Sequence, residues 1–123
     1  MKQPLRALIV DDSVATRMLL KDMLESAGHQ VVAEAENQTE ALQAYAAHKP
    51  DVMTLDLSLA QGDGLSVLKA IRQLDANAKV VVISGNSQQK VLEMIQAAGA
   101  AGFLAKPFKI DELVAAVERV VPA

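Results

Sequence analysis

Hydrophobic residues along the chain fall into two alternating kinds of segment. Short apolar runs rich in β-branched residues, several without polar alternation, are typical of strands covered on both faces. These runs are residues 7–10, 31–33, 52–55, 80–83 and 102–105. Longer segments with helical periodicity follow each run, at about residues 14–27, 38–48, 65–74, 88–98 and 110–121. The pattern therefore predicts five strands that alternate with five helices.

Residues suited to helix ends lie where this pattern needs them. Asn37 precedes the second helix, with Glu40 three residues further on, as in a capping box. Gly28 and Gly99 follow the first and fourth helices, where glycine commonly ends a helix. Alternating strands and helices predict a doubly wound α/β fold, a parallel sheet with helices on both faces and right-handed crossovers. No linker or internal repeat divides the chain, so we expect a single domain over residues 1–123.

Composition removes several classes of function. A formal net charge of -3 and a pI near 5.3 argue against direct binding of nucleic acid, which needs a basic face. The chain has no cysteine, which excludes disulfides, thiolate zinc sites, iron–sulfur clusters and cysteine nucleophiles. No apolar run approaches the roughly 20 residues that span a bilayer, and no long apolar signal segment begins the chain. We therefore expect a cytoplasmic protein without membrane insertion.

Polar side chains stand at the ends of four predicted strands. Asp11 and Asp12 end the first strand, Asp56 the third, Ser84 the fourth and Lys106 the fifth. Sites in open parallel sheets form beyond the carboxyl ends of the strands. The sequence thus predicts three carboxylates, a hydroxyl and an ammonium group around one shared space.

Three neighbouring carboxylates repel one another unless a pKa rises, a cation binds or Lys106 pairs with one of them. Oxygen ligands without histidine or cysteine favour a hard cation such as Mg²⁺. An aspartate beside such a cation and an ammonium group is suited to attack a phosphoryl group. Taken singly, Asp12 or Ser13 would be an ordinary helix cap and Asp56 an ordinary turn residue. Their coincidence at one sheet edge favours phosphoryl-transfer chemistry.

The same segments resemble the receiver domain of response regulators, the phosphoacceptor module of two-component signalling. The resemblance covers essentially the whole chain. It implies a flavodoxin-like fold with the strand order 2-1-3-4-5. The matching segments are Leu8–Ser13, Pro50–Leu57, Asp63–Gly64, Val81–Gly85 and Gly99–Phe108.

This resemblance implies a role for each acidic residue. Asp56 would accept a phosphoryl group from a phosphohistidine donor, which is a histidine kinase or a histidine phosphotransfer protein. Asp11, Asp12, Asp56 and the backbone carbonyl of Ser58 would hold Mg²⁺ (or Mn²⁺), with Asp12 the more direct ligand of the acidic pair.

The resemblance also implies a switch. Lys106 would pair with the phosphoryl group, Ser84 would move toward it, and Phe103 would be the switch aromatic. The bond between Lys106 and Pro107 is expected to be cis. An unknown output protein would bind the face formed by the fourth helix, fifth strand and fifth helix.

Several apolar residues have two readings. On the fourth helix, some face a partner or all belong to the core: Val91, Leu92, Met94, Ile95 and Ala98. On the first helix, Val14, Ala15 and Met18 would dock the phosphotransfer partner, or at least one of them packs in the core. His29 and His48 are predicted to be surface residues. Tyr45 is predicted to be half-buried.

The chain departs from the family pattern after the phosphoacceptor position. Leu59 and Ala60 replace a frequent Met-Pro pair, and Gly62 replaces a second frequent methionine, so we predict a more mobile segment 58–64. Ser58 and Asn86 occupy positions that influence dephosphorylation in the family. They leave the lifetime of the phosphoryl group open.

Other classes of protein fit less well. A phosphatase with an aspartyl-phosphate intermediate commonly needs a second acid two residues after its nucleophile, where this chain has Ser58. A flavin carrier needs a phosphate-binding first loop, which Asp11 and Asp12 would repel. The intact set of polar residues argues against a phosphorylation-independent interaction domain. We therefore expect a non-enzymatic phosphoacceptor. Met1 and the Pro122–Ala123 end favour a stand-alone receiver over a domain of a longer regulator with a DNA-binding or enzymatic output.

Overall fold

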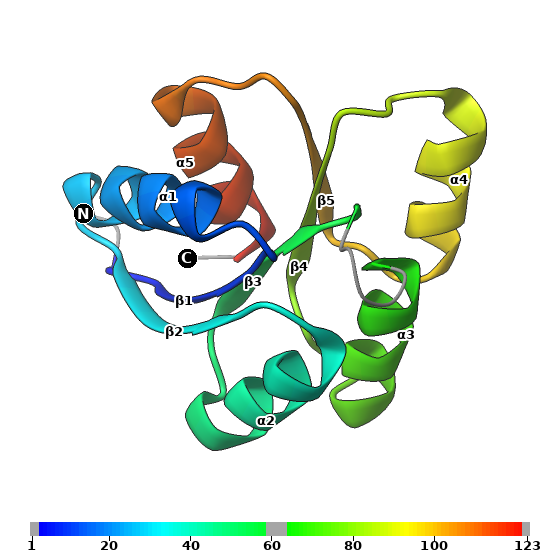
Figure 1. The fold of residues 1–123 in the computed structure, drawn as a ribbon, viewed down its shortest axis with the longest axis horizontal. Coiled ribbons are helices and arrows are strands. Elements are labelled where there is room, and N and C mark those ends of the chain that lie inside the picture. The colour runs from blue at the N-terminus through cyan, green and yellow to red at the C-terminus, as the bar shows by residue number, and fades with distance from the viewer. Residues whose placement is uncertain (1–2, 59–63, 122–123) are drawn as a thin grey trace.

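Strands and helices alternate along the chain, as the hydrophobic pattern predicts (Figure 1). The computed structural model describes residues 3–58 and 64–121, and over these residues it contains five strands and five helices. The strands are β1 (Arg6–Val10), β2 (Gln30–Ala35), β3 (Val52–Asp56), β4 (Val80–Ser84) and β5 (Gly102–Ala105). The helices are α1 (Val14–Ser26), α2 (Gln38–His48), α3 (Gly64–Leu74), α4 (Gln89–Ala97) and α5 (Ile110–Val120).

All strand pairs of the sheet are parallel, and their order is β2-β1-β3-β4-β5. This confirms the predicted fold class and strand order. Val10 lies opposite Leu55, and Asp56 lies opposite Ile83, so the ends of the three central strands are nearly level. The carboxyl ends of all strands therefore meet at one edge of the sheet.

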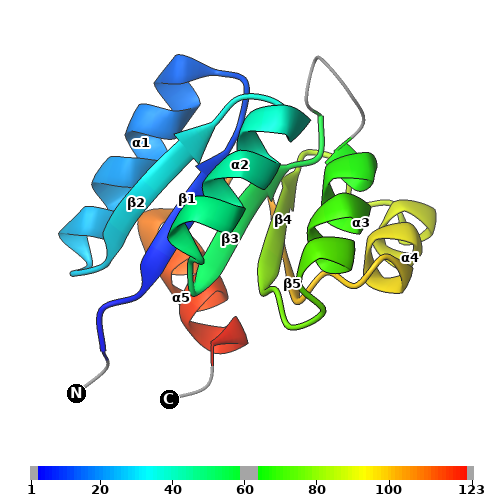
Figure 2. The same cartoon turned by 90° about the horizontal axis from the view of Figure 1, so that it is seen from below.

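Helices cover both faces of the sheet, and each face has its own hydrophobic core. Helices α1 and α5 lie on one face, whereas α2 and α3 lie on the other (Figures 1 and 2). The first core contains Leu20 and Leu24 of α1 with Leu113 of α5. The second contains Leu68 of α3 and extends to Ile95 of α4. Both cores are mainly aliphatic, as a chain with 2% aromatic residues requires.

Local side-chain contacts fix the helix ends. The Ser13 hydroxyl accepts a hydrogen bond from the backbone N–H of Thr16 at 3.2 Å, and Ser13 is thereby the N-cap of α1. Asn37 caps α2 by accepting from the N–H of Glu40 at 2.9 Å. The Glu40 carboxylate accepts from the N–H of Glu36 at 3.0 Å, one residue earlier than in a standard capping box.

His29 is buried, and the prediction that it lies on the surface is wrong. The residue is 7% exposed, and it lies directly before β2. Nδ1 accepts a hydrogen bond from the Leu5 N–H at 3.0 Å, and Nε2 lies 2.8 Å from a carboxylate oxygen of Glu118 on α5. These partners are far away in sequence, so no local pattern indicates the burial. His48 is exposed, as predicted.

Tyr45 is more deeply buried than predicted, with 6% of its surface exposed. Its hydroxyl donates a hydrogen bond to the Asp75 carboxylate at 2.8 Å. Burial, and then this hydrogen bond, raise the pKa of Tyr45 above its ordinary value. The tyrosine therefore joins α2 to the end of α3 on the second face of the sheet.

No helix within residues 3–58 and 64–121 is both long enough and apolar enough to cross a membrane.

Candidate functional site

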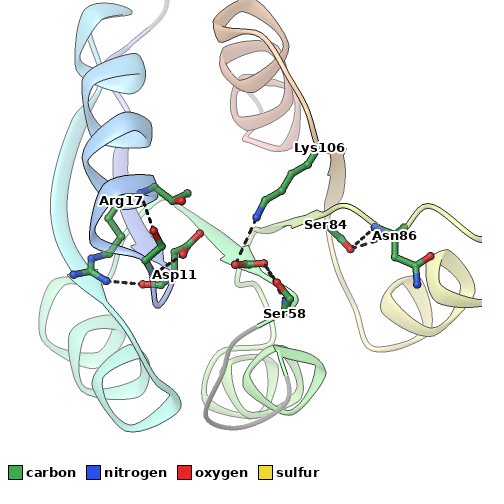
Figure 3. Close-up of polar contacts among 9 residues, drawn as sticks. Asp11, Arg17, Ser58, Ser84, Asn86 and Lys106 are labelled. Atoms are coloured by element: carbon green, nitrogen blue, oxygen red, sulfur yellow. Dashed lines mark hydrogen bonds and ion pairs between the residues drawn. The ribbon is translucent and has the colours of Figure 1, made fainter.

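The carboxyl edge of the sheet brings together the polar side chains that follow its strands (Figure 3). Asp56 and Ser84 are the last residues of β3 and β4, and Asp11 and Lys106 directly follow β1 and β5. Backbone hydrogen bonds extend the ladders past these strand ends. The Asp11 N–H donates to the Ala35 carbonyl at 3.0 Å, and the Lys106 N–H donates to the Ser84 carbonyl at 2.9 Å.

Three carboxylates form an acidic cluster at this edge. One carboxylate oxygen from each of Asp11, Asp12 and Asp56 lies within 4.8 Å of the others. Asp11 and Asp56 are buried, whereas Asp12 is exposed. Such proximity is electrostatically unfavourable unless a positive charge or a proton compensates it.

The pKa of Asp11 reflects its burial and this crowding of carboxylates. Burial raises its pKa above the ordinary value, and the carboxylates of Asp56 and Asp12 raise it further. The backbone N–H of Ser13 donates to Asp11 Oδ1 at 2.9 Å and opposes this rise, as does the charge of Lys106. A cation bound at the cluster would oppose this rise in the pKa of Asp11.

Asp56 is held on both sides. Lys106 Nζ lies 3.6 Å from Asp56 Oδ2. The backbone N–H and the hydroxyl of Ser58 donate to Asp56 Oδ1 at 3.0 and 2.9 Å. The peptide bond between Lys106 and Pro107 is cis, as the family resemblance implies.

Ser84 is bonded within its own loop. The N–H of Asn86 donates to the Ser84 hydroxyl at 3.0 Å, and the hydroxyl lies 3.4 Å from the Asn86 carbonyl oxygen. Figure 3 shows Lys106 extending over the carboxyl edge of the sheet, whereas the Ser84 hydroxyl points toward Asn86. In this conformation the Ser84 hydroxyl is engaged by Asn86.

Sequence reasoning missed two contacts at the site. It assigned Ser58 a role as a metal ligand through its backbone carbonyl and an influence on dephosphorylation, whereas the structure adds a hydrogen bond from its hydroxyl to Asp56. It did not consider Arg17, whose guanidinium Nη1 donates to the backbone carbonyl of Asp11 at 2.7 Å. A basic residue one turn into the helix that follows Asp11 was the available signal.

The apolar residues with two readings divide between core and surface. Val14, Ala15 and Met18 are all exposed, so the reading that places at least one in the core is wrong. Leu19 is also exposed, at 51%. On α4, Ile95 is buried and Leu92 packs against the core, whereas Met94 is 46% exposed. Phe103 is half-buried and packs against the second core. The predicted mobility around Leu59, Ala60 and Gly62 lies outside the described residues.

The donor atoms of the site suit a hard divalent cation. The cluster offers carboxylate oxygens only, and Lys106 places an ammonium group beside one of them, that of Asp56. Mg²⁺ binds such oxygen ligands through a few carboxylates and keeps further positions for water or phosphate oxygens. The residues present therefore fit a magnesium site.

Comparison with known proteins supports the resemblance to receiver domains that the sequence motifs indicate. Residues 7–118 match the family model of the response regulator receiver domain. Chemotaxis protein CheY of Bacillus subtilis is 43% identical over 117 residues, which cover 94% of this chain and 97% of that protein. CheY of Thermotoga maritima is 42% identical over 116 residues, with coverages of 94% and 96%.

Solved structures give the same fold. The crystal structure of a CheX–CheY complex with BeF₃ and Mg²⁺ from Borrelia burgdorferi contains a chain that matches with a TM-score of 0.92 at 31% identity. The match covers 98% of this chain and 91% of that chain. The similarity thus extends through every strand that contributes to the candidate site.

Proposed function

The chain belongs to the family of response regulator receiver domains, and on that premise we propose that Asp56 accepts a phosphoryl group. The observation that carries the proposal is the position of Asp56, between the ammonium group of Lys106 and two further carboxylates at one sheet edge. The donor would be a phosphohistidine of a histidine kinase or a histidine phosphotransfer protein. The chain would be a signalling module rather than an enzyme with a separate substrate.

In the transfer step, a carboxylate oxygen of Asp56 forms a bond to phosphorus. The phosphorus–nitrogen bond of the donor breaks, and its electron pair stays with the donor imidazole. Lys106 faces Oδ2 at 3.6 Å, where its charge stabilises the transferring oxygens. The two donors of Ser58 hold Oδ1 and so orient the carboxylate.

Four groups would hold the cation, namely the carboxylates of Asp11, Asp12 and Asp56 and the backbone carbonyl of Ser58. Bound Mg²⁺ (or Mn²⁺) supplies positive charge that neutralises phosphoryl oxygens during transfer. The raised pKa of Asp11 supports this assignment, because burial and the neighbouring carboxylates of Asp56 and Asp12 raise it, and a bound cation would oppose that rise.

Phosphorylation would act on Ser84, Lys106 and Phe103. The phosphoryl group adds roughly one further negative charge and three acceptor oxygens to the edge. Lys106 would pair with it, and the Ser84 hydroxyl would leave Asn86 to donate to it. Phe103 is half-buried, and the exposed part of its ring would become buried when Ser84 moves. The surface of α4, β5 and α5 would change as a result.

Two surfaces would then bind partners. The exposed residues Val14, Ala15 and Met18 next to the site support docking of the phosphotransfer partner on α1. The face of α4, β5 and α5 would bind the output protein, and the exposed Met94 supports an apolar contact there. The chain matches its CheY relatives over nearly their whole length, and one CheY is found in a complex with CheX. Output through protein contact is the mode we propose, without direct binding of nucleic acid.

Intact-mass measurement tests the proposal. Incubation with phosphoramidate and Mg²⁺ is expected to add one phosphoryl group to the wild-type protein, and to add none when Mg²⁺ is chelated. Asp56→Asn should remain unmodified, whereas Asp22→Asn, which changes an exposed aspartate on α1, should be modified normally. An unmodified wild-type protein, or equal modification of Asp56→Asn, would contradict the proposal.

A further inference from the structure

Arg17 joins the loop that carries the acidic pair to the edge strand of the sheet. It lies one turn into α1, and its side chain is only 14% exposed. Nη1 donates to the backbone carbonyl of Asp11 at 2.7 Å (Figure 3), and Nε donates to a carboxylate oxygen of Glu34 on β2 at 3.1 Å. One guanidinium group therefore contacts both the site loop and β2.

This contact completes the backbone bonding of Asp11. The Asp11 N–H donates to the Ala35 carbonyl, and the Asp11 carbonyl accepts from Arg17. The Ser13 N–H separately holds the Asp11 carboxylate. The peptide unit that leads from Asp11 to Asp12 is thus fixed at its oxygen by a charge-assisted hydrogen bond, which is stronger than a neutral one. The orientation of that peptide sets the position of the Asp12 Cα atom and therefore the direction in which its side chain leaves the backbone.

The carboxylate of Glu34 balances the positive charge that Arg17 places near the acidic cluster. A guanidinium charge beside the Asp11 carbonyl would repel a divalent cation bound to the adjacent carboxylates. The Glu34 carboxylate, 35% exposed, pairs with Nε and balances that charge. Arg17 can therefore fix the loop without lowering the affinity of the cluster for a cation.

We propose that Arg17 and Glu34 form a clamp that positions Asp11 and Asp12 for cation binding. Arg17 is then a positioning residue that acts through the Asp11 carbonyl and does not touch the cation. This inference rests on the proposed magnesium site. It also predicts that lysine cannot replace Arg17, because an ammonium group lacks the planar fork that reaches two acceptors at once.

Backbone NMR titration with Mg²⁺ tests the clamp. Arg17→Met is expected to weaken Mg²⁺ binding roughly tenfold, the loss typical when a group that orients a metal ligand is removed. Arg17→Lys should recover little of this affinity. Arg72→Met is the matched control, because Arg72 also donates to backbone carbonyls, those of Ala76 and Ala78, but at the opposite edge of the sheet. It should lose stability without a change in Mg²⁺ affinity.

Glu34→Gln removes the charge that balances Arg17 and leaves the hydrogen bond from Arg17 to the Asp11 carbonyl in place. It tests the proposal even if Arg17→Met folds poorly. It leaves the Arg17 charge unbalanced, so Mg²⁺ binding should weaken at low salt, and the difference from wild type should shrink as salt rises. Mg²⁺ affinities equal to wild type in all the Arg17 and Glu34 variants would overturn the clamp alone. A wild-type protein whose amide signals do not respond to Mg²⁺ would overturn the magnesium site itself, and the clamp with it.

Discussion

Lys106 Nζ lies 3.6 Å from Asp56 Oδ2. Asp56 is the last residue of β3 and Lys106 directly follows β5, and β4 lies between these two strands. The lysine side chain therefore crosses the end of β4 to reach the end of β3. Its charge faces Asp56 and lowers the pKa of Asp11, which burial otherwise raises. Lys106 would thus compete with a cation for the same carboxylates before phosphorylation, and it would face the phosphoryl group afterward.

Replacing Lys106 should change two measured quantities in opposite directions. Lys106→Gln removes the competing charge, so Mg²⁺ affinity should rise by roughly fivefold, as about 1 kcal/mol for a partly exposed ion pair implies. The rate of phosphorylation by phosphoramidate should fall by roughly a hundredfold, because charge on the transferring oxygens is no longer stabilised. Lys69→Gln, an exposed lysine on α3, is the control with the same change in net charge. A parallel fall of affinity and rate would contradict this role of Lys106.

Neutralising Asp11 should stabilise the metal-free protein. Its folded-state pKa lies above the ordinary value, so the folded protein favours the protonated carboxyl group. The stability that this preference contributes is complete below the unfolded pKa and is lost as pH rises through the folded pKa. Asp11→Asn should therefore raise the free energy of unfolding at pH 7, and the gain should shrink as pH falls toward 4. Urea denaturation in the presence of a chelator measures this. Added Mg²⁺ should stabilise the wild type more than the variant, and a gain that does not depend on pH would contradict the electrostatic explanation.

Gly64 should tolerate no side chain. A Cβ atom there would lie 2.5 Å from the carbonyl oxygen and 2.6 Å from the Cα of Leu57, the residue between Asp56 and Ser58. Gly64→Ala should cost about 1–3 kcal/mol of stability, as overpacking typically does. It should also weaken Mg²⁺ binding by displacing Ser58. Gly85→Ala is the control for stability, because a Cβ at Gly85 meets open space. Equal effects of the two substitutions on thermal unfolding would contradict the prediction.

His29 and Glu118 should be coupled in stability. Because Nδ1 accepts from the Leu5 N–H, the ring proton belongs on Nε2, where it is donated to Glu118. His29→Phe keeps a planar ring but loses both hydrogen bonds, and a cost of about 1–3 kcal/mol is expected for the buried N–H left unpaired. A double-mutant cycle with Glu118→Gln should give a coupling of about 1 kcal/mol, and His48→Phe should have no effect. Additive effects would show that the pair does not contribute as a unit.

Much of the fold follows from local pattern. Apolar runs without alternation marked the strands, because both faces of this sheet are covered, and helix periodicity marked the segments between them. Parallel strands place their carboxyl ends together, so Asp11, Asp12, Asp56 and Lys106 were expected at one edge before any geometry was known. The contacts that define the cluster agree with that expectation.

Contacts between distant segments were beyond the sequence pattern. The prediction that His29 is exposed was wrong, because its burial depends on Glu118, which lies on a helix at the other end of the chain. The role of Arg17 depends on Glu34, whose place beside α1 is set by the packing of β2. Polar residues are buried where a nonlocal partner satisfies them, and that partner cannot be identified from spacing alone.

The location of the phosphoryl group tests the central claim most directly. Aspartyl phosphate can be reduced with borohydride to homoserine, which marks the modified residue in a peptide mass spectrum. After reaction with phosphoramidate and Mg²⁺, we predict homoserine at position 56 and unchanged aspartate at Asp11 and Asp12. Homoserine at position 11 or 12, or at none of the three positions, would contradict the assignment of Asp56 as the phosphoacceptor.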